Sequence, residues 1–487
     1  MTATLMEVAA AAGATAGDQA GRGAWPGVTV EAITHNSRAV APGTLFCCVP
    51  GAWADGHDFA AQAAAAGAVA LLVERRLAVD LPQLVVGDVR RAMGPAASAV
   101  YGHPSRELTV IGVTGTNGKS STVALLAAIW EKAGQRAEVY GTLTGERTTP
   151  EAPDLQRQLR ESRDRGVSVV AMEVSSHALE LGRVGGTRFA AAVFTNLGRD
   201  HLDFHGDVES YYRAKARLFS PGHTDTAVVN LDDAHGRRLA GELASVAGIA
   251  THGYALADAE GLRADGPVSR FVWRGHPVIL QLAGRHNVSN ALAAATTAAA
   301  LGLDAAPVVA ALEDARPVRG RFELVDGGQP FHVAVDYAHT PDALEAVIAA
   351  AREVTAGRVI VLFGCGGDRD HDKRPEMGAV VDRLADLAVV TSDNPRSEDP
   401  DAIIAAVLAG MAAGDQASGT DRGPDPDRIR VEPDRRRAIA LALSMAAPGD
   451  LVLLAGKGHE TTQVIGDHTL AFDDRAVVLE ALREARA

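Results

Sequence analysis

The sequence predicts an α/β protein with several domains. From Leu108 onward, short β-branched runs bounded by Gly or Asp alternate with Ala-rich helical stretches, which is the pattern of βα units on a mainly parallel sheet. The chain has 487 residues, and at roughly 150 residues per domain this length predicts about three domains. Its 47% hydrophobic and 22% charged residues are typical of globular chains and exclude a collagenous, coiled-coil or wholly disordered polymer.

The first domain is expected over residues 1–105. Runs at 29–34, 44–49 and 68–73 have the composition of strands, and the turn-rich residues 101–105 close this unit. The second domain is expected over 106–318, with strands at 108–113, 167–172, 190–195 and 227–230 and helices between them. Its end is placed where Pro317 and Gly320 interrupt a helical pattern.

The third domain is expected over residues 319–487, with strands at 358–363, 387–391 and 450–455. Residues 414–427 are rich in Gly, Asp, Ser and Pro, which predicts a mobile surface loop.

The charge balance limits the partners. Lys plus Arg is 47 against 61 for Asp plus Glu, a net charge of −14, which is the wrong sign for binding nucleic acid or an anionic membrane. The longest apolar run, 63–73, is about half of a bilayer span, and residues 1–20 lack the pattern of a signal peptide. We therefore expect a cytoplasmic protein with neither nucleic acid nor membrane as partner. Its three cysteines, Cys47, Cys48 and Cys365, fit no zinc or CxxC pattern and are expected to be reduced and structural.

A phosphate-binding loop is predicted at residues 114–121. A β-branched run leads into a glycine-containing loop, and an Ala/Leu-rich helix follows directly. Such a loop points backbone N–H groups at phosphates, with a lysine as mobile cation and a serine hydroxyl for Mg²⁺. The strict pattern has Gly six positions before the lysine, where this chain has Val113. ATP is the expected ligand, bound by Gly115, Thr116, Asn117, Gly118, Lys119, Ser120 and Ser121.

Two metal-binding candidates follow later strands. Glu173 and His201 each come at the carboxyl end of an apolar strand, where open α/β sheets build their sites. A carboxylate and an imidazole there suit Mg²⁺ beside bound phosphates, with water completing the octahedron.

The chain resembles the Mur ligases over nearly its whole length. The resemblance rests on the phosphate loop and on motifs at residues 173–177, 195–201, 211–219, 284–290, 336–341 and 456–460. It implies an N-terminal UDP-substrate-binding domain, a central ATPase domain and a C-terminal Rossmann-like domain for the incoming amino acid. It also implies an ATP-dependent carboxylate–amine ligase of peptidoglycan synthesis, which forms an acyl phosphate on the D-Glu of UDP-MurNAc-L-Ala-D-Glu. We expect a monomer.

The resemblance also implies roles for individual residues. Lys119 would face the phosphates, Ser120 and Glu173 would hold one Mg²⁺, and His201 would hold a second. Lys215 would hold that second ion as a carbamate formed with CO₂, since an ammonium beside Mg²⁺ would be repelled. Asn287, Arg321 and Asp336 would contact adenine and ribose. Thr148, Thr149, Ser175 and Arg183 would contact the muramoyl dipeptide. Ser37, Trp53 and Asp55 would contact uridine. At Trp53 and Leu181 the chain departs from many relatives.

The motif at residues 392–396 favours diaminopimelate as the added amino acid. Diaminopimelate carries a second carboxylate that lysine lacks, and a guanidinium such as that of Arg396 can bind it through two charge-assisted hydrogen bonds. The resemblance implies further contacts with the amino acid. Arg369 would bind a carboxylate and Glu460 an ammonium, and the remaining contacts are Asp393, Asn394 and Gly456. The meso and LL isomers share these groups; meso is the expected one.

Three alternatives stay open at this point. One is an L-lysine-adding ligase of the same family, and another is a ligase like folylpolyglutamate synthase, although neither gives Arg396 a use. The third is a nucleotide-binding scaffold without catalysis, which would not need Lys119, Glu173, His201 and Lys215 together.

Overall fold

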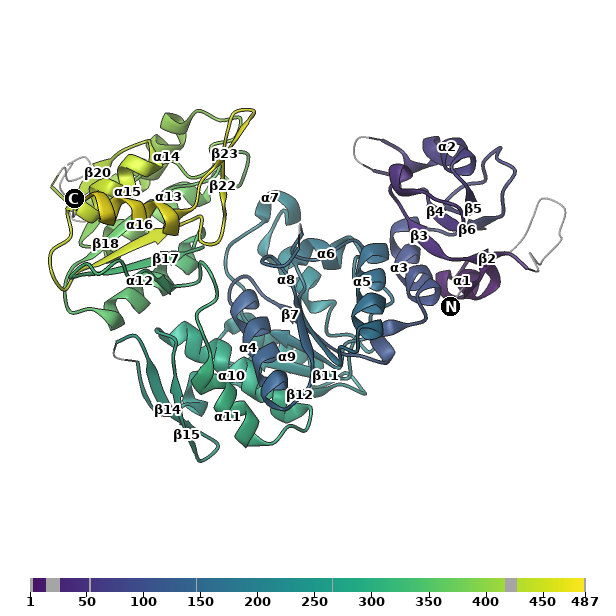
Figure 1. The fold of residues 1–487 in the computed structure, drawn as a ribbon, viewed down its shortest axis with the longest axis horizontal. Helices are drawn as coiled ribbons and strands as arrows, with labels where there is room; N and C mark the ends of the chain where they lie inside the picture. The colour runs from purple at the N-terminus through teal and green to yellow at the C-terminus, as the bar shows by residue number, and fades with distance from the viewer. Residues whose placement is uncertain are drawn as a thin grey trace.

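The structure is a computed structural model, and it describes residues 3–14, 27–51, 54–145, 147–264, 266–416 and 427–485. Three α/β domains follow one another along the chain, and the N-terminal and C-terminal domains lie on opposite sides of the central one (Figure 1). The predicted α/β class is confirmed.

The N-terminal domain contains a parallel sheet in the order β3-β4-β5-β6 and the antiparallel pair β1–β2. The single strand expected at 29–34 is wrong: it splits at Glu31 into β2, which pairs with β1, and β3, which pairs with β4. The elements are β1 (Ala3–Thr4), α1 (Leu5–Ala12), β2 (Thr29–Val30), β3 (Ala32–Thr34), η1 (Ser37–Ala39), β4 (Thr44–Cys47), η2 (Gly56–Phe59), α2 (Ala60–Ala65), β5 (Ala68–Val73), β6 (Gln83–Val85) and α3 (Val89–Val100).

The central domain contains a six-stranded parallel sheet in the order β12-β11-β10-β7-β9-β8. The four strands expected here are confirmed to within two residues at each end, whereas β8, β12 and the antiparallel sheet β13-β14-β15 were not predicted. The strands are β7 (Thr109–Thr114), β8 (Ala137–Tyr140), β9 (Val169–Glu173), β10 (Ala191–Phe194), β11 (Thr226–Asn230), β12 (Ala250–Tyr254), β13 (Glu260–Arg263), β14 (Ser269–Trp273) and β15 (His276–Leu280). The helices are η3 (Pro104–Arg106), α4 (Lys119–Lys132), α5 (Ala152–Asp164), α6 (Ser176–Glu180), α7 (Leu202–His205), α8 (Val208–Ala216), α9 (Ala234–Leu243), η4 (Leu256–Asp258), α10 (Arg285–Ala300) and α11 (Ala305–Asp314).

Strand β7 is apolar on both sides because the sheet is covered on both faces. Ile111 and Val113 pack into the core beside α4, α10 and α11, while Val110 points to the opposite core beside α5 and α8. The strands β8 and β9 lie on one side of β7, and β10, β11 and β12 on the other. The carboxyl end of β7 is therefore the switch point at which open α/β sheets bind ligands.

The C-terminal domain contains a six-stranded sheet in the order β16-β17-β21-β18-β19-β20, in which β16 alone is antiparallel to its neighbour. The three expected strands are present. The elements are β16 (Glu323–Leu324), β17 (His332–Asp336), α12 (Pro341–Val354), β18 (Val359–Phe363), α13 (Lys373–Leu384), β19 (Leu387–Val390), α14 (Pro400–Gln416), β20 (Ile429–Val431), α15 (Arg435–Ser444), β21 (Leu451–Ala455), β22 (Thr462–Ile465), β23 (His468–Ala471) and α16 (Asp474–Glu484).

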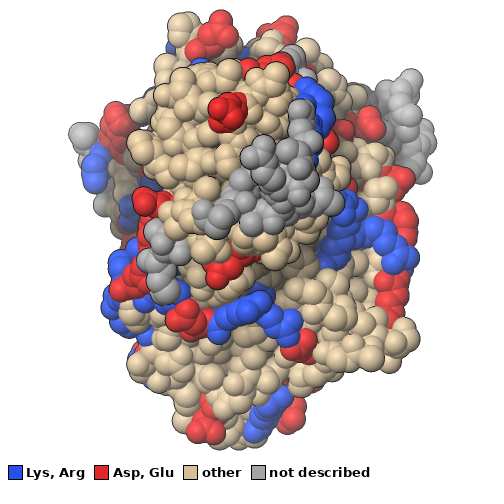
Figure 2. Space-filling view, turned by 90° about the vertical axis from the view of Figure 1, so that its right-hand side faces the viewer, with Lys and Arg blue, Asp and Glu red and all other residues tan. Residues whose placement is uncertain are grey.

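The loop expected at 414–427 is only partly described. Helix α14 runs to Gln416, so the expectation is wrong for residues 414–416, and residues 417–426 lie outside the described residues. The cysteines are buried and free, as expected. None of the helices in the described parts of the chain is long and apolar enough to cross a membrane. Figure 2 shows Lys and Arg side chains interspersed with Asp and Glu on the face it presents.

Candidate active site

The loop between β7 and α4 has a backbone that only glycine can adopt at two positions. Gly118 has a φ of +86°, and a Cβ there would overlap Asn290 Oδ1. Gly115 has a φ of +149°, and a Cβ there would overlap Thr195 Oγ1. These glycines let the loop turn tightly from the strand end into the first turn of α4, whose free N–H groups and dipole attract phosphate.

Two lysines converge on this loop. Lys119 Nζ donates to the carbonyl oxygens of Gly115 at 2.9 Å and Thr116 at 2.7 Å. Lys215, on α8 and 1% exposed, donates to the same Gly115 oxygen at 2.9 Å. Burial lowers the pKa of both amines, and the pKa of Lys215 falls well below its usual range, with the charge of Lys119 contributing. Burial among these groups therefore disfavours the charged form of the Lys215 amine.

Glu173 reaches the start of α4 from the neighbouring strand. It is paired in register with Val113, and its Oε1 accepts hydrogen bonds from Ser120 Oγ and Thr142 N, both at 3.0 Å. Arg321 Nη2 also donates to Ser120 Oγ, at 3.1 Å. A hydroxyl and a carboxylate side by side at a phosphate loop are the hard oxygen donors that Mg²⁺ prefers.

The described residues contain no cluster of three or more His, Cys, Asp or Glu that could hold a metal ion by itself. A cation at Ser120 and Glu173 would thus take its other ligands from phosphates and water. That is how Mg²⁺ is usually held in nucleotide sites, so the residues present fit the expected ion.

His201 stands at the start of α7, after the end of β10, with a left-handed φ of 55°. Its Nε2 lies 3.3 Å from Asp200 Oδ2, and its ring is 4.7 Å from that of His177. Burial lowers the pKa of His201 to about 3, so the imidazole is neutral and its lone pair is free for an electrophile or a cation. Asp200, 7% exposed, was not predicted, although it belongs to the motif that indicated His201.

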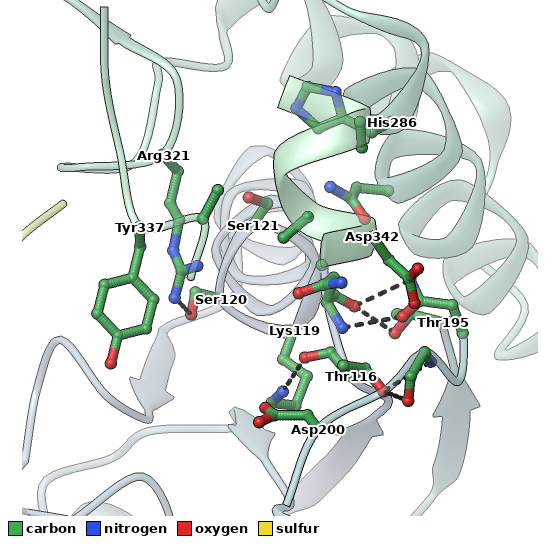
Figure 3. A pocket seen from close by; sticks show the side chains of 18 of the residues that line it. Thr116, Lys119, Ser120, Ser121, Thr195, Asp200, His286, Arg321, Tyr337 and Asp342 are labelled. Carbon is green, nitrogen blue, oxygen red and sulfur yellow. Dashed lines mark hydrogen bonds between the residues drawn. The ribbon is translucent and has the colours of Figure 1, made fainter. Parts of the chain in front are cut away.

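Residues beyond the second predicted boundary close the nucleotide pocket. The Arg321 guanidinium lies 4.6 Å from the Tyr337 ring and reaches Ser120 across the pocket (Figure 3). Asp336 is buried and accepts the backbone N–H of Phe322 and of Ala338, each at 2.7 Å. Asp336 thus fixes the bend of the backbone around Arg321.

One pocket of about 500 Å³ brings most of the nucleotide-site predictions together. It lies between the phosphate loop, α10 and the first turn of α12, and Asn287 holds the α10 end by donating to Ala283 O at 2.8 Å. Its lining includes Thr116, Asn117, Gly118, Lys119, Ser120, Ser121, Thr148, Glu173, Ser175, His201, Asn287, Arg321 and Asp336.

The residues expected to hold the dipeptide surround the end of β9. Thr149 Oγ1 donates to the carbonyl of Glu173 at 2.9 Å and accepts from Ser175 N at 3.1 Å. Arg183 Nε lies 2.9 Å from Glu151 Oε1. Thr148 is 3.0 Å from Thr142, through their hydroxyls. The structure thus gathers the four predicted residues around the end of β9, and two of them, Thr148 and Ser175, line the pocket of the phosphate loop.

A second pocket of about 470 Å³ lies between the N-terminal and central domains. Ser37 lines it, whereas the carboxylate of Asp55 accepts hydrogen bonds from His57 N at 2.9 Å and Arg75 Nη2 at 2.8 Å. These hydrogen bonds lower the pKa of Asp55, that from the His57 backbone most. Trp53 lies outside the described residues.

The predicted amino-acid residues form a buried network in the C-terminal domain. Asn394 Nδ2 donates to Glu460 Oε2 at 2.8 Å, and Lys457 Nζ donates to that oxygen at 2.9 Å and to Asn394 Oδ1 at 3.2 Å. Lys457 is 0% exposed and lies 3.7 Å from Asp393. Gly456 has a φ of +115°, and a Cβ there would lie 3.2 Å from the Asp393 carboxylate. Lys457 was not predicted, although a lysine between two glycines in a predicted motif was the available signal.

Arg396 and Arg369 flank the glycine loop after β18. Arg396 has a left-handed φ of 53°, and its Nη1 donates to Gly367 O at 2.6 Å. Arg369 is exposed and donates to the Asp368 carbonyl at 3.1 Å. A Cβ at Gly366 would lie 3.0 Å from Arg396 Nη1 and 3.8 Å from Arg369 Cγ. The Arg396 guanidinium and the Arg369 side chain thus both approach Gly366, and a guanidinium is suited to binding a carboxylate.

Comparison with known proteins gives the same family over all three domains. Three family models match: "Mur ligase family, catalytic domain" over residues 29–106, "Mur ligase middle domain" over 113–298, and "Mur ligase, glutamate ligase domain" over 320–458. The UDP-N-acetylmuramoyl-L-alanyl-D-glutamate–2,6-diaminopimelate ligase of Streptomyces avermitilis is 45% identical over 483 residues, 94% of this chain and 93% of that protein. The ligase of the same name from Geobacillus kaustophilus is 44% identical over 478 residues, covering 93% and 95%. A solved structure of a ligase with this name superposes with a TM-score of 0.68 at 32% identity and covers 100% of both chains.

Proposed function

The chain belongs to the Mur ligase family, and we propose that it joins 2,6-diaminopimelate to the D-Glu of UDP-MurNAc-L-Ala-D-Glu at the cost of ATP. The observation that carries this function is the identity above 40% to diaminopimelate ligases over more than nine tenths of the chain. The arrangement of Arg396, Asn394 and Glu460 supports it, because guanidinium, amide and carboxylate groups match the carboxylates and ammoniums of diaminopimelate.

The chemistry starts from a carboxylate, which is a poor electrophile. ATP transfers its γ-phosphoryl group to the D-Glu γ-carboxylate, and the amine of diaminopimelate then attacks the acyl phosphate and expels inorganic phosphate. Positioning and charge stabilisation carry such a reaction. Lys119 and the N–H groups at the start of α4 neutralise the phosphates, and Arg321 adds positive charge from the C-terminal domain.

Magnesium is the cofactor that suits this site. Bound Mg²⁺ neutralises charge on the transferred phosphoryl group; Ser120 and Glu173 are its proposed ligands, and His201 is proposed for a second ion. We further propose that Lys215 carries a carbamate formed with CO₂, since a neutral, buried amine is the form that adds CO₂. The resulting anion would join His201 at the second ion.

The remaining substrate contacts follow the domain interfaces. Thr148, Thr149, Ser175 and Arg183 are proposed for the muramoyl dipeptide, because they lie together around the end of β9 and Thr148 and Ser175 line the pocket of the phosphate loop. The pocket lined by Ser37 is proposed for the uridine end. Asn287 and Asp336 are proposed to contact the adenosine end of ATP, and Arg369 a carboxylate of the amino acid. We also propose that the domain boundaries lie at residues 105 and 318.

We also propose that the enzyme acts as a cytoplasmic monomer, with small-molecule substrates and without nucleic acid or membrane partners. The meso isomer of diaminopimelate is the proposed substrate.

Phosphate release tests the function. With ATP, Mg²⁺ and UDP-MurNAc-L-Ala-D-Glu, release should depend on added meso-diaminopimelate and yield the tripeptide product by mass. L-Lysine would replace diaminopimelate in a lysine-adding ligase, and a folate with glutamate would be ligated by a folylpolyglutamate synthase-like enzyme. A scaffold without catalysis would release no phosphate with any amino acid.

A further inference from the structure

The loop that carries Asp200 and His201 is tied to the C-terminal domain through the side chain of Arg199. Arg199 Nη1 donates to Glu376 in the first turn of α13, and Nη2 lies 3.6 Å from Asp372, the residue before that helix. One guanidinium from the central domain thus faces two carboxylates of the opposite domain. Its side chain is 32% exposed, against 43% for Glu376.

The backbone of the same loop makes a second contact with the C-terminal domain. The N–H of Arg199 donates to Asp342 Oδ2 at 3.2 Å, near the start of α12. A Cβ at Gly198 would overlap this carboxylate, so Asp342 lies directly against the backbone of the loop. The loop therefore docks in a defined position against two helices of the other domain.

Helix α13 is equally tied to the amino-acid site. Arg374, 4% exposed in its side chain, donates to both oxygens of Glu398 at 2.9 and 2.8 Å. Glu398 follows Arg396 by two residues and also accepts Asp368 N at 2.6 Å. Asp368 in turn precedes Arg369. The first turn of α13 thus holds both loops that carry the arginines proposed to bind diaminopimelate.

We infer that Arg199 is a positioning residue that couples the nucleotide site to the amino-acid site through α13. When the Asp200–His201 loop is docked, the ion pairs of Arg199 hold α13 in place. Arg374, on α13, then holds the loop of Arg396 in place through its ion pair with Glu398. Loss of Arg199 leaves both sites intact but lets the two domains sample other relative positions. The amino acid then binds to an arrangement that is populated for a smaller fraction of the time.

Loss of Arg199 should raise KM for diaminopimelate and leave the Kd of the nucleotide nearly unchanged. This inference rests on the proposed function. Because exposed ion pairs contribute modestly, Arg199→Ala should raise KM for diaminopimelate about fivefold, which is about 1 kcal/mol. The Kd of a non-hydrolysable ATP analogue for the enzyme without other substrates should change less than about twofold, because Arg199 lies outside the residues that hold the phosphates.

Steady-state kinetics with a double-mutant cycle tests the coupling. Glu376→Ala should raise the same KM, and the double variant should lose less than the sum of the singles, since they share one interaction. Arg199→Lys should recover part of the loss, and the exchanged pair Arg199→Glu with Glu376→Arg should perform better than either single reversal. The matched control is Arg436→Ala, which breaks an exposed Arg–Glu pair with Glu480 inside the C-terminal domain, and it should leave KM for diaminopimelate unchanged.

Several outcomes would overturn the inference. These are an unchanged KM in Arg199→Ala, an equal rise in the Kd of the nucleotide analogue, and additive effects in the cycle. If the unmutated enzyme does not ligate diaminopimelate, the proposed function fails instead, and the wild-type assay separates the two failures.

Discussion

Lys119 and Lys215 donate hydrogen bonds to the same carbonyl oxygen, that of Gly115, each over 2.9 Å. Two ammonium groups this close would repel each other strongly in a buried site. Burial, followed by the charge of Lys119, lowers the pKa of Lys215 well below its ordinary value. The site therefore disfavours a positive charge on both amines at once, and carbamylation would turn the Lys215 amine into an anion.

Replacement of Lys215 tests this idea. Lys215→Ala should nearly abolish ligation because the proposed second cation loses a ligand, and short-chain carboxylates such as acetate should partly restore turnover by filling the vacated anionic position. Initial rates with and without acetate measure both effects. Lys132→Ala, which removes a half-exposed lysine paired with Asp314, should keep full activity. Wild-type turnover in Lys215→Ala would contradict the proposal.

Ligand binding should draw the C-terminal domain toward the central domain. We propose that the phosphates bind at Lys119. Arg321 lies beyond the second domain boundary and already contacts Ser120 across the pocket, so bound ATP and dipeptide would bridge both domains. Solution scattering should show a smaller radius of gyration with an ATP analogue and UDP-MurNAc-dipeptide than without them. Unchanged scattering with both ligands bound would count against closure.

A fully buried ion pair should contribute to the stability of the C-terminal domain. Arg435 donates to both Asp474 oxygens, at 2.9 and 2.6 Å, and both side chains are 0% exposed. Arg435→Met leaves a buried carboxylate without its partner, which should lower the free energy of unfolding by about 3–5 kcal/mol. Urea unfolding measures the loss. Adding Asp474→Leu should recover most of it, whereas exposed Arg436→Ala should change stability by less than about 0.5 kcal/mol.

The free energy of unfolding should fall as the pH drops from about 6.5 to 4. Burial lowers the pKa of His286 to about 4, and burial followed by the charge of Lys373 does the same for His339. Between these values and the ordinary histidine pKa of about 6.5, the unfolded chain binds protons that the folded chain does not. Each histidine thus removes at most about 1.4 kcal/mol per pH unit. Denaturant unfolding at pH 7, 6 and 5 should show this slope, and His339→Gln should reduce it; an unchanged slope would contradict the assignment.

The sequence was sufficient to predict the parts of the site that follow single strands. Glu173 ends an apolar strand, and Lys119 and His201 lie in or just after the loops that follow two others. The rule that ligands bind at the carboxyl ends of strands therefore predicts that the three lie together. Strand register could be wrong by a residue or two without changing that outcome. The split at Glu31 was not predictable in this way, because it depends on which sheets the two halves join.

Contacts between segments that are distant in the chain could not be predicted from the sequence. Arg199 and Glu376 are 177 positions apart, and although Arg199 lies within the motif at residues 195–201, nothing in the sequence indicates that the two residues pair. Lys457 likewise lies within the motif at residues 456–460, but its contact with Asn394 depends on the placement of β21 against the loop after β19. Such pairs need the relative placement of whole elements, which hydrophobic periodicity does not give.

We propose that the selection of the amino acid depends most on Arg396. Its left-handed backbone and its hydrogen bond to Gly367 hold the guanidinium beside Arg369, and the main chain of Arg396 is fixed by Val464 and Gly466. The distal carboxylate of diaminopimelate can replace the carbonyl of Gly367 as its partner with two charge-assisted hydrogen bonds. L-Lysine has an ammonium at that end, which the Arg396 guanidinium would repel.

Arg396→Ala should therefore change the preference between the two amino acids and not only the rate. KM for diaminopimelate should rise greatly, because loss of an ion pair in a closed site costs about 2–5 kcal/mol, whereas the use of L-lysine should fall much less or improve. Competition assays give the ratio of the two kcat/KM values, and this ratio is the decisive quantity, since a folding defect or damaged ATP binding would depress both substrates equally. Arg437→Ala, an exposed residue of α15, should leave the ratio unchanged. Equal losses for both amino acids in Arg396→Ala, or efficient use of L-lysine by the unmutated enzyme, would place the distal carboxylate elsewhere.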